Sequence, residues 1–162
     1  MNTGQTTRRD FLATTVATSL AASCACAFCE LADAAPAGPV DIGTPADFPT
    51  DGPYDKFAAK PTGVLVVRDG GKIYATTAAC PHKQATLEVA NGTIHCPKHG
   101  SLFDLSGVPQ PKTDKGKPAP AKRPLVRFAI KQDAQGHLIV DRSKTFDKPR
   151  WEDPASYVSV KA

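Results

Sequence analysis

Short apolar runs rich in β-branched residues recur along the chain, and pairs of runs are separated by glycine-containing turns. The paired runs are residues 63–68 with 72–76, 87–90 with 93–95, and 125–131 with 137–141. Their turns contain Gly70-Gly71, Asn91-Gly92 and Gln135-Gly136, and Asn-Gly is the strongest short hairpin signal. The pattern predicts three β-hairpins and an all-β fold, since no long amphipathic stretch indicates a helix.

The same pattern delimits the folded part of the chain. Residues 35–39 are small or proline and indicate a linker, and the alternating residues 40–42 open the folded part. We assign residues 40–143 to one domain, because a stretch of this length supports one hydrophobic core. The tail, residues 144–162, contains the only tryptophan, Trp151, and is predicted to lie across the sheet as an extra strand or as coil.

Candidate metal ligands follow two of the predicted strands. Cys80 and His82 are separated by one residue, and Cys96 and His99 are separated by two. Two thiolates and two imidazoles suit either a zinc ion or an iron-sulfur cluster. Zinc arms usually place two or more residues between ligands that share one ion. The tighter arm from Cys80 to His82 therefore favours two different metal atoms, as in a two-iron cluster.

The two ligand boxes, Cys-Pro-His at 80–82 and Cys-Pro-Lys-His-Gly at 96–100, resemble those of the Rieske proteins. The 2Fe-2S cluster of that family has two cysteines on one iron and two histidines on the other. The resemblance covers residues 40–141. It implies one such cluster per chain, a fold of antiparallel sheets with a small cluster-binding subdomain, and a hydrogen bond from Ser101 to a bridging sulfide. The implied ligands are Cys80, His82, Cys96 and His99.

Three positions depart from the high-potential members of that family. Those members join the two ligand loops by a disulfide, and the corresponding residues here are Ala85 and Lys98. Phe103 stands where a tyrosine hydroxyl often donates to a ligand sulfur. Loss of a hydrogen bond with a redox preference of about 1–2 kcal/mol lowers the potential by roughly 40–90 mV. We expect direct electrochemistry to give a potential in the lower or middle part of the family range of about −150 to +300 mV.

Other residues near the boxes receive structural interpretations. His95 precedes Cys96 on a predicted strand and should point the opposite way, and His137 is distant in sequence, so neither is assigned as a ligand. Residues 109–124 are rich in proline and lysine, and composition alone indicates a flexible linker. Within it, residues 118–120 resemble the proline loop that covers the cluster in the family and limits water access.

The first 34 residues have the pattern of a signal peptide, with a basic pair, an alanine-rich apolar run and then small residues. Arg8-Arg9 lies in a stretch that resembles the twin-arginine export motif, and that route carries folded, cofactor-loaded proteins. Residues 32–34 fit a cleavage site, and cleavage would remove Cys24, Cys26 and Cys29 and leave 128 of the 162 residues. We expect a periplasmic or otherwise exported protein.

Two alternatives stay open for this leader. A lipoprotein site at Cys24 lacks the expected leucine, because Ala21 occupies that position. An uncleaved segment at about 11–31 would anchor the protein in a membrane, although its many threonines, serines and alanines make it a poor span.

Charge narrows the classes of partner. The chain has a formal charge of +4 and no basic helix or aromatic-interleaved basic segment, so nucleic acid is not expected as a partner. One polar stretch gathers Lys112, Lys115, Lys117, Lys122 and Arg123. We interpret this stretch as a solvated loop, with docking of an acidic partner as the alternative.

Together these features predict an exported one-electron transfer protein that works with a redox partner protein or a quinol and has no substrate chemistry of its own. The resemblance implies that its potential falls as pH rises through the histidine ionisations. The first alternative is a Rieske subunit of a larger oxidoreductase, either a quinol:cytochrome c reductase or an arsenite-oxidase-like small subunit. A ferredoxin of a ring-hydroxylating dioxygenase shares the absent disulfide but works in the cytoplasm. A zinc-stabilised binding module is the last alternative.

Overall fold

The computed structural model describes residues 38–160, which form eleven strands and three short 3₁₀ helices. The expectations for the signal peptide, its cleavage and a retained anchor fall on residues outside this range. Within residues 38–160, no helix has both the length and the apolar character needed to cross a membrane.

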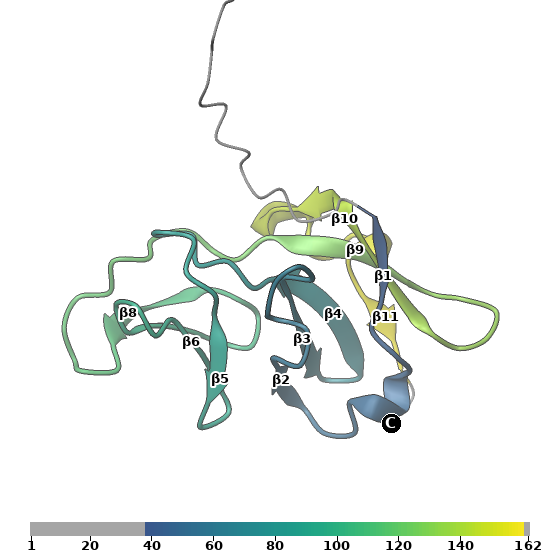
Figure 1. Cartoon of the computed structure of the whole chain (residues 1–162), viewed down its shortest axis with the longest axis horizontal. Helices are drawn as coiled ribbons and strands as arrows, with labels where there is room; N and C mark the ends of the chain where they lie inside the picture. Colours follow the sequence, from purple (N-terminus) through teal and green to yellow (C-terminus); the bar gives the residue numbers. More distant parts are fainter. Residues whose placement is uncertain (1–37, 161–162) are drawn as a thin grey trace, which may run out of the picture. The chain divides into compact units, whose positions relative to one another are not determined.

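Seven strands form a large antiparallel sheet in the order β1-β10-β9-β4-β3-β2, with β11 paired to β4 (Figure 1). Its strands are β1 (Pro39–Asp41), β2 (Gly52–Tyr54), β3 (Val64–Asp69), β4 (Lys72–Thr77), β9 (Arg127–Gln132), β10 (Leu138–Phe146) and β11 (Val158–Ser159). The 3₁₀ helices are η1 (Pro45–Asp47), η2 (Lys148–Arg150) and η3 (Pro154–Ser156).

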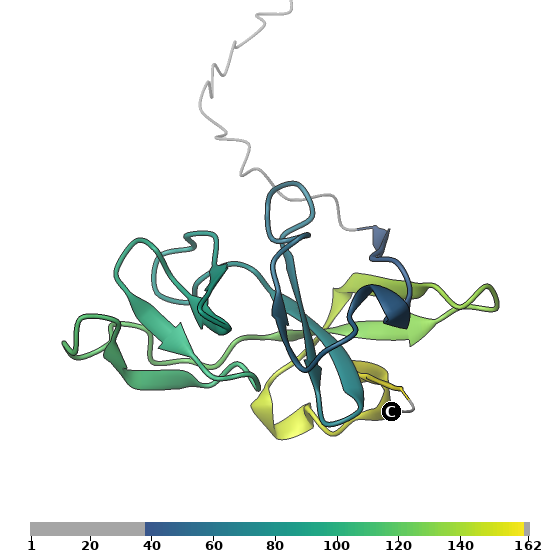
Figure 2. The same ribbon diagram turned by 90° about the horizontal axis from the view of Figure 1, so that it is seen from below.

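Four strands form a small antiparallel sheet in the order β5-β6-β7-β8. They are β5 (Glu88–Ala90), β6 (Thr93–His95), β7 (Ser101–Phe103) and β8 (Pro109–Thr113). Figures 1 and 2 show this sheet on one side of the β3–β4 hairpin and the β9–β10 hairpin on the other. The predicted all-β fold of antiparallel sheets is confirmed.

All three predicted hairpins form, and their turns adopt the backbone that the sequence required. Gly70 and Gly71 have φ values of 55° and 79°, and Asn91 and Gly92 have values of 50° and 71°. Two successive positive φ angles match the twist of the flanking strands, which is why these dipeptides specify tight hairpins. Gly136, in the third turn, has a φ of 88°.

The proline-rich segment after β7 differs from the linker that its composition indicated. Residues 109–113 form β8, the last strand of the small sheet, which pairs with β7 and forms one isolated β-bridge, between Lys112 and Pro118, on its other side. Prolines are tolerated in a strand at the end of a sheet, and Pro111 still accepts a hydrogen bond from Ala119 N through its carbonyl. Composition missed this strand because its partner, β7, directly follows the second ligand box and was not itself predicted as a strand.

The β3–β4 hairpin separates two hydrophobic cores, because successive side chains of a strand point to opposite faces. Val64 and Val66 of β3 pack in one core with residues of β9 and β10. Leu65 and Val67 pack in the other core, and all four side chains are fully buried. That second core also holds Cys80, Leu87, Ile94, Cys96, Phe103 and Leu125. The register that buries β3 on both faces therefore also fixes the ligand cysteines in the second core.

The C-terminal tail is anchored on the large sheet, and β11 supplies the extra strand that the sequence left open against coil. Trp151 is buried, and its ring centroid lies 4.5 Å from the guanidinium carbon of Arg127. The same carbon lies 3.6 Å from the ring centroid of Tyr74. A cation held between two aromatic rings attaches the tail to β4 and β9.

A pH-dependent contact attaches β1 to the start of β10, where His137 Nδ1 lies 2.7 Å from Asp41 Oδ2. The hydrogen bond with Asp41 raises the pKa of His137 above 6.5, so its stabilisation is complete below about pH 6.5 and is lost as pH rises through the raised value. The Gly43 N–H and then His137 lower the pKa of Asp41 below 3.8, and that stabilisation is lost as pH falls through the lowered value.

Replacing His137 with asparagine is therefore expected to lower Tm slightly at pH values between these two ionisations. Above the His137 ionisation, the pH-dependent part of the Tm difference between wild type and variant should disappear. Thermal melts of wild type and variant across this range measure the difference. Asp41→Asn is the matched control and should give the same profile. A difference in Tm that stays constant with pH would contradict the ion pair, whose effect is small because both groups are solvated.

Candidate metal centre

The first ligand loop is a six-residue turn that connects β4 to β5. Cys80 N donates to Ala85 O at 2.8 Å, and Gln84 N donates to Cys80 O at 2.8 Å. Gln84 has a positive φ of 51°, which turns the chain back toward the sheet. These bonds hold Cys80 at the buried base of the loop and leave His82 near its tip.

The second ligand loop, between β6 and β7, repeats this geometry. Cys96 N donates to Ser101 O at 2.9 Å, and Gly100 N donates to Cys96 O at 2.8 Å. Gly100, the fifth residue of the loop, has a φ of 71°. Asp114 N donates to Gly100 O at 3.0 Å and attaches this loop to the chain after β8. The ligand boxes are therefore a matched pair of turns with the same backbone hydrogen bonds.

The loops bring the four predicted ligands together as a sulfur pair and an imidazole pair. Cys80 and Cys96 are free thiols, each about 1% exposed, and they interact with each other. The rings of His82 and His99 meet edge to face, with centroids 4.8 Å apart. His99 is exposed and His82 is partly buried. The sulfur pair thus lies in the core and the imidazole pair lies at the surface.

The electrostatics of the two pairs differ. Burial raises the pKa of the Cys80 thiol, the backbone N–H groups of His82 and Lys83 oppose that rise, and the neighbouring Cys96 adds to it. Two adjacent buried thiolates are therefore unfavourable unless a cation compensates them. Desolvation and then the neighbouring His82 lower the pKa of His99, which favours the neutral imidazole that binds metals.

An unpaired polar atom supplies a test of whether these residues fit a two-iron cluster. His82 Nδ1 is buried and has no hydrogen-bond partner. A buried imidazole nitrogen without a partner is costly, and coordination to a metal would satisfy it. The four predicted ligands form two pairs, the adjacent thiols of Cys80 and Cys96 and the adjacent rings of His82 and His99. A pair of thiols and a pair of imidazoles fit the donor set of a Rieske cluster, which has two cysteines on one iron and two histidines on the other.

Two residues beside the cysteines bear on the predicted potential. Ser101 is fully buried, and its Oγ accepts a hydrogen bond from Ala121 N at 3.3 Å. Its hydroxyl proton is left for another acceptor, so the predicted bond from Ser101 to a sulfide stays a prediction. Phe103 is fully buried in the same core as the cysteines and offers no hydroxyl at that position.

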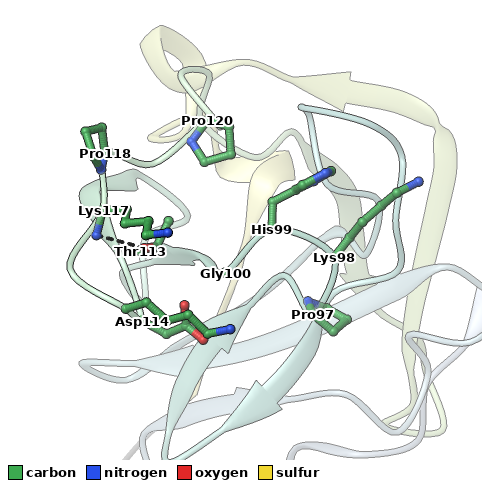
Figure 3. A pocket seen from close by; sticks show the side chains of 10 residues that line it. Pro97, Lys98, His99, Gly100, Thr113, Asp114, Lys117, Pro118 and Pro120 are labelled. Atoms are coloured by element: carbon green, nitrogen blue, oxygen red, sulfur yellow. Dashed lines mark hydrogen bonds between the residues drawn. The ribbon is translucent and has the colours of Figure 1, made fainter.

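A third loop lies against the second ligand loop. Pro118 and Pro120 line a cavity of about 340 Å³ together with Pro97 and His99. Figure 3 shows Pro118 and Pro120 facing the second ligand loop across the cavity. Arg123, which follows the prolines, donates to Pro81 O in the first ligand loop at 3.3 Å. The proline segment therefore flanks the site from a third side, as the resemblance implied.

The two remaining histidines of the chain have other contacts. His95 Nδ1 lies 3.1 Å from Glu88 Oε1, and its Nε2 lies 3.5 Å from Asp114 Oδ2. His137 is at the surface beside Asp41. Sequence reasoning did not identify Asp114 and Arg123 as supports of the ligand loops, because both act across long sequence separations that no local pattern signals.

Comparisons with known proteins agree with this geometry. Residues 38–128 match the model of the Rieske [2Fe-2S] domain family. A comparison with curated protein sequences found no match.

Several solved structures resemble the chain at low identity. The Rieske protein PetC3 of the plasma membrane of Synechocystis PCC 6803 is 28% identical, with 62% of this chain and 97% of that chain covered and a TM-score of 0.46. The ferredoxin of carbazole 1,9a-dioxygenase from Nocardioides aromaticivorans IC177 is 28% identical, with 63% and 95% covered and a TM-score of 0.44. A complex of reduced oxygenase and oxidised ferredoxin in carbazole 1,9a-dioxygenase gives 23% identity, 67% and 97% coverage and a TM-score of 0.46.

The family match spans more than half of the chain and includes both ligand loops. The chain belongs to the Rieske [2Fe-2S] domain family, and it is an electron-transfer protein that binds a 2Fe-2S cluster.

Proposed function

We propose that this protein is exported by the twin-arginine route and carries single electrons between redox partners outside the cytoplasm, without substrate chemistry of its own. The observation that carries the proposal is the arrangement of the four ligand side chains, two buried thiols behind two imidazoles of which one is exposed. The leader at residues 1–34 supplies the export step, and the cluster domain at 40–143 follows it.

The residues of the two loops would divide the work. When bound, the cluster supplies one-electron oxidation and reduction. Cys80 and Cys96 would hold one iron from inside the core, and His82 and His99 would hold the other at the surface. The buried loop bases exclude water from the sulfurs, while the exposed His99 ring lies where a partner can contact it.

The partner is proposed to be a redox protein or a quinol. An exposed imidazole suits both, because it can contact a protein surface or exchange a hydrogen bond with a quinol oxygen. Ala85 and Lys98 preclude the disulfide of the high-potential quinol-oxidising members, and the loops rely instead on their paired backbone hydrogen bonds. This favours a separate carrier over a subunit of a quinol:cytochrome c reductase.

Cell fractionation combined with cofactor analysis tests the proposal. The full chain, expressed in a bacterium with a twin-arginine system, should give a red-brown periplasmic protein with two irons and two acid-labile sulfides per chain. Replacing Arg8 and Arg9 with lysine should leave the coloured protein in the cytoplasm, because the charge is kept and only the address is changed.

Three results would overturn the proposal or part of it. A colourless protein with one zinc and no sulfide would make the metal structural. Equal export of wild type and the double lysine variant would remove the twin-arginine route. Recovery of the protein only within a larger complex would identify it as a subunit of an oxidoreductase.

A further inference from the structure

The positive charge of the described chain is concentrated in the region of the ligand loops. Residues 81–123 contain seven lysines and arginines and three carboxylates, a net charge of +4. The rest of residues 38–160 contains ten basic and ten acidic side chains, which cancel. All of the net charge of residues 38–160 therefore belongs to the segment that holds three of the four proposed ligands, His82, Cys96 and His99.

These basic side chains are exposed, and their charges are not compensated locally. Six of them define what we call the basic tip, namely Lys83, Lys98, Lys115, Lys117, Lys122 and Arg123. None of the six forms a salt bridge within residues 38–160. The three nearby carboxylates have other contacts: Glu88 and Asp114 lie against His95, and Asp104 accepts from Ser106 and Val108.

The basic tip comes from three loops that converge on the imidazole pair. Lys83 follows His82 in the first loop, and Lys98 precedes His99 in the second. Lys115 and Lys117 line the cavity beside His99, and Figure 3 shows Lys117 there. Arg123, from the third loop, donates to the carbonyl of Pro81. The charges thus surround the place where an electron would leave the protein.

The electrostatic force on a molecule that approaches the ligand loops would come mainly from the charges of the basic tip. Salt screens charges over about 8–10 Å at physiological ionic strength, so the neutral remainder of the domain adds little at the tip. We propose that the basic tip is a docking surface for the acidic face of a redox partner protein. The inference deepens the proposed function and rests on it, because the partner is the electron donor or acceptor.

The chemistry of the tip favours an acidic protein over other polyanions. Residues 81–123 contain a single Phe, Tyr or Trp side chain, Phe103, and it is fully buried. Sites for single-stranded nucleic acid use exposed aromatics for base stacking. Membrane-surface segments use exposed Trp, Phe or Leu to enter the interface. A surface of cations and prolines without such anchors fits exposed ion pairs with the carboxylates of a partner. Such pairs speed the association of two proteins in a transient complex.

Oxidants of opposite charge report the charge of this surface directly. The holoprotein is reduced and then mixed either with hexacyanoferrate(III), an anion, or with tris(phenanthroline)cobalt(III), a cation. One electron passes from the protein to one metal complex in each case. The rate with the anion should fall as ionic strength rises, and the rate with the cation should rise, because the surface around the cluster has a net positive charge. A ferric acidic c-type cytochrome should likewise react about tenfold or more faster than a basic one at low salt.

Charge reversal locates the effect. Lys98→Glu with Lys117→Glu should slow hexacyanoferrate(III) about tenfold at low ionic strength and have little effect at high ionic strength. Lys131→Glu with Lys148→Glu is the matched control, with the same change in net charge on exposed residues of β9 and η2. This control should change the rates much less.

The outcomes distinguish failure of the proposed docking surface from failure of the proposed electron-transfer function. If neither oxidant reoxidises the protein, the electron-transfer proposal fails. If both do so at rates independent of salt, or if the two charge-reversal pairs act equally, the docking surface is refuted and electron transfer stands. Tighter, tip-dependent binding to single-stranded DNA or to phosphatidylglycerol vesicles than to the acidic cytochrome would also refute it.

Discussion

The Gly100→Ala variant is expected to lose about 2–5 kcal/mol of stability and most of its bound cluster. Gly100 has a φ of 71°, where a residue with a Cβ costs about 1–2 kcal/mol. The added Cβ would also overlap Asp114 Oδ1 and lie 3.0 Å from Asp114 Cγ and 3.3 Å from Thr113 Cβ. Crowding of this kind typically adds about 1–3 kcal/mol.

The position of Gly100 directs this cost to the ligand loop. Its N–H donates to Cys96 O and its carbonyl accepts from Asp114 N, so it closes the second loop and joins it to β8. A backbone shift that relieves the overlap would move Cys96 or His99 relative to the first loop, whereas a rotation of the exposed Asp114 side chain would change its contact with His95. Denaturation midpoints and visible absorbance per protein measure the two effects.

Gly116→Ala is a close control, because Gly116 has a φ of 72° and no atom within 4 Å of an added Cβ. It should show only the backbone cost of about 1–2 kcal/mol and keep its cluster. Adding Asp114→Ala to Gly100→Ala should recover part of the difference, since the overlap with the carboxylate is removed while the positive φ persists. Equal losses in the two glycine variants would show that close packing at Gly100 is unimportant.

The features that could be predicted from the sequence are those that depend on a few consecutive residues. The three hairpins were predictable because Gly70-Gly71, Asn91-Gly92 and Gln135-Gly136 specify their own backbone. The ligand boxes were recognisable because their spacing encodes the turn that presents them. Both kinds of feature need only a few consecutive residues.

What the sequence did not predict depends on distant partners. β8 is a strand only because β7 offers an edge to a proline-containing segment. The contact of Asp114 with the Gly100 carbonyl and that of Arg123 with Pro81 O bring together residues 14 and 42 positions apart. The basic tip likewise became visible only when Lys98 was found beside the lysine-rich stretch that composition described as a solvated loop, and when Arg123 of that stretch was found in contact with the loop that contains Lys83.

Replacing any one of Cys80, His82, Cys96 and His99 is expected to remove the cluster. The loss of bound cluster should be larger than the roughly 10–100-fold loss of metal affinity that follows mutation of residues that only support metal ligands. Serine at Cys80 or Cys96 offers a neutral hydroxyl in the buried core in place of a thiolate. Alanine at His82 or His99 leaves the outer metal atom with one protein ligand. Iron content, acid-labile sulfide and visible absorbance of anaerobically purified protein measure the loss.

His95→Ala is the matched control for these variants, because His95 immediately precedes Cys96 and yet lies against Glu88 and Asp114. The ring is partly buried, so its removal should cost some stability and leave iron, sulfide and colour near their wild-type levels. A colourless His95→Ala protein with a retained cluster in His99→Ala would exchange the roles of the two histidines. The geometry supports His99, and not His95, as the ligand, because the rings of His99 and His82 meet edge to face while His95 lies between two carboxylates.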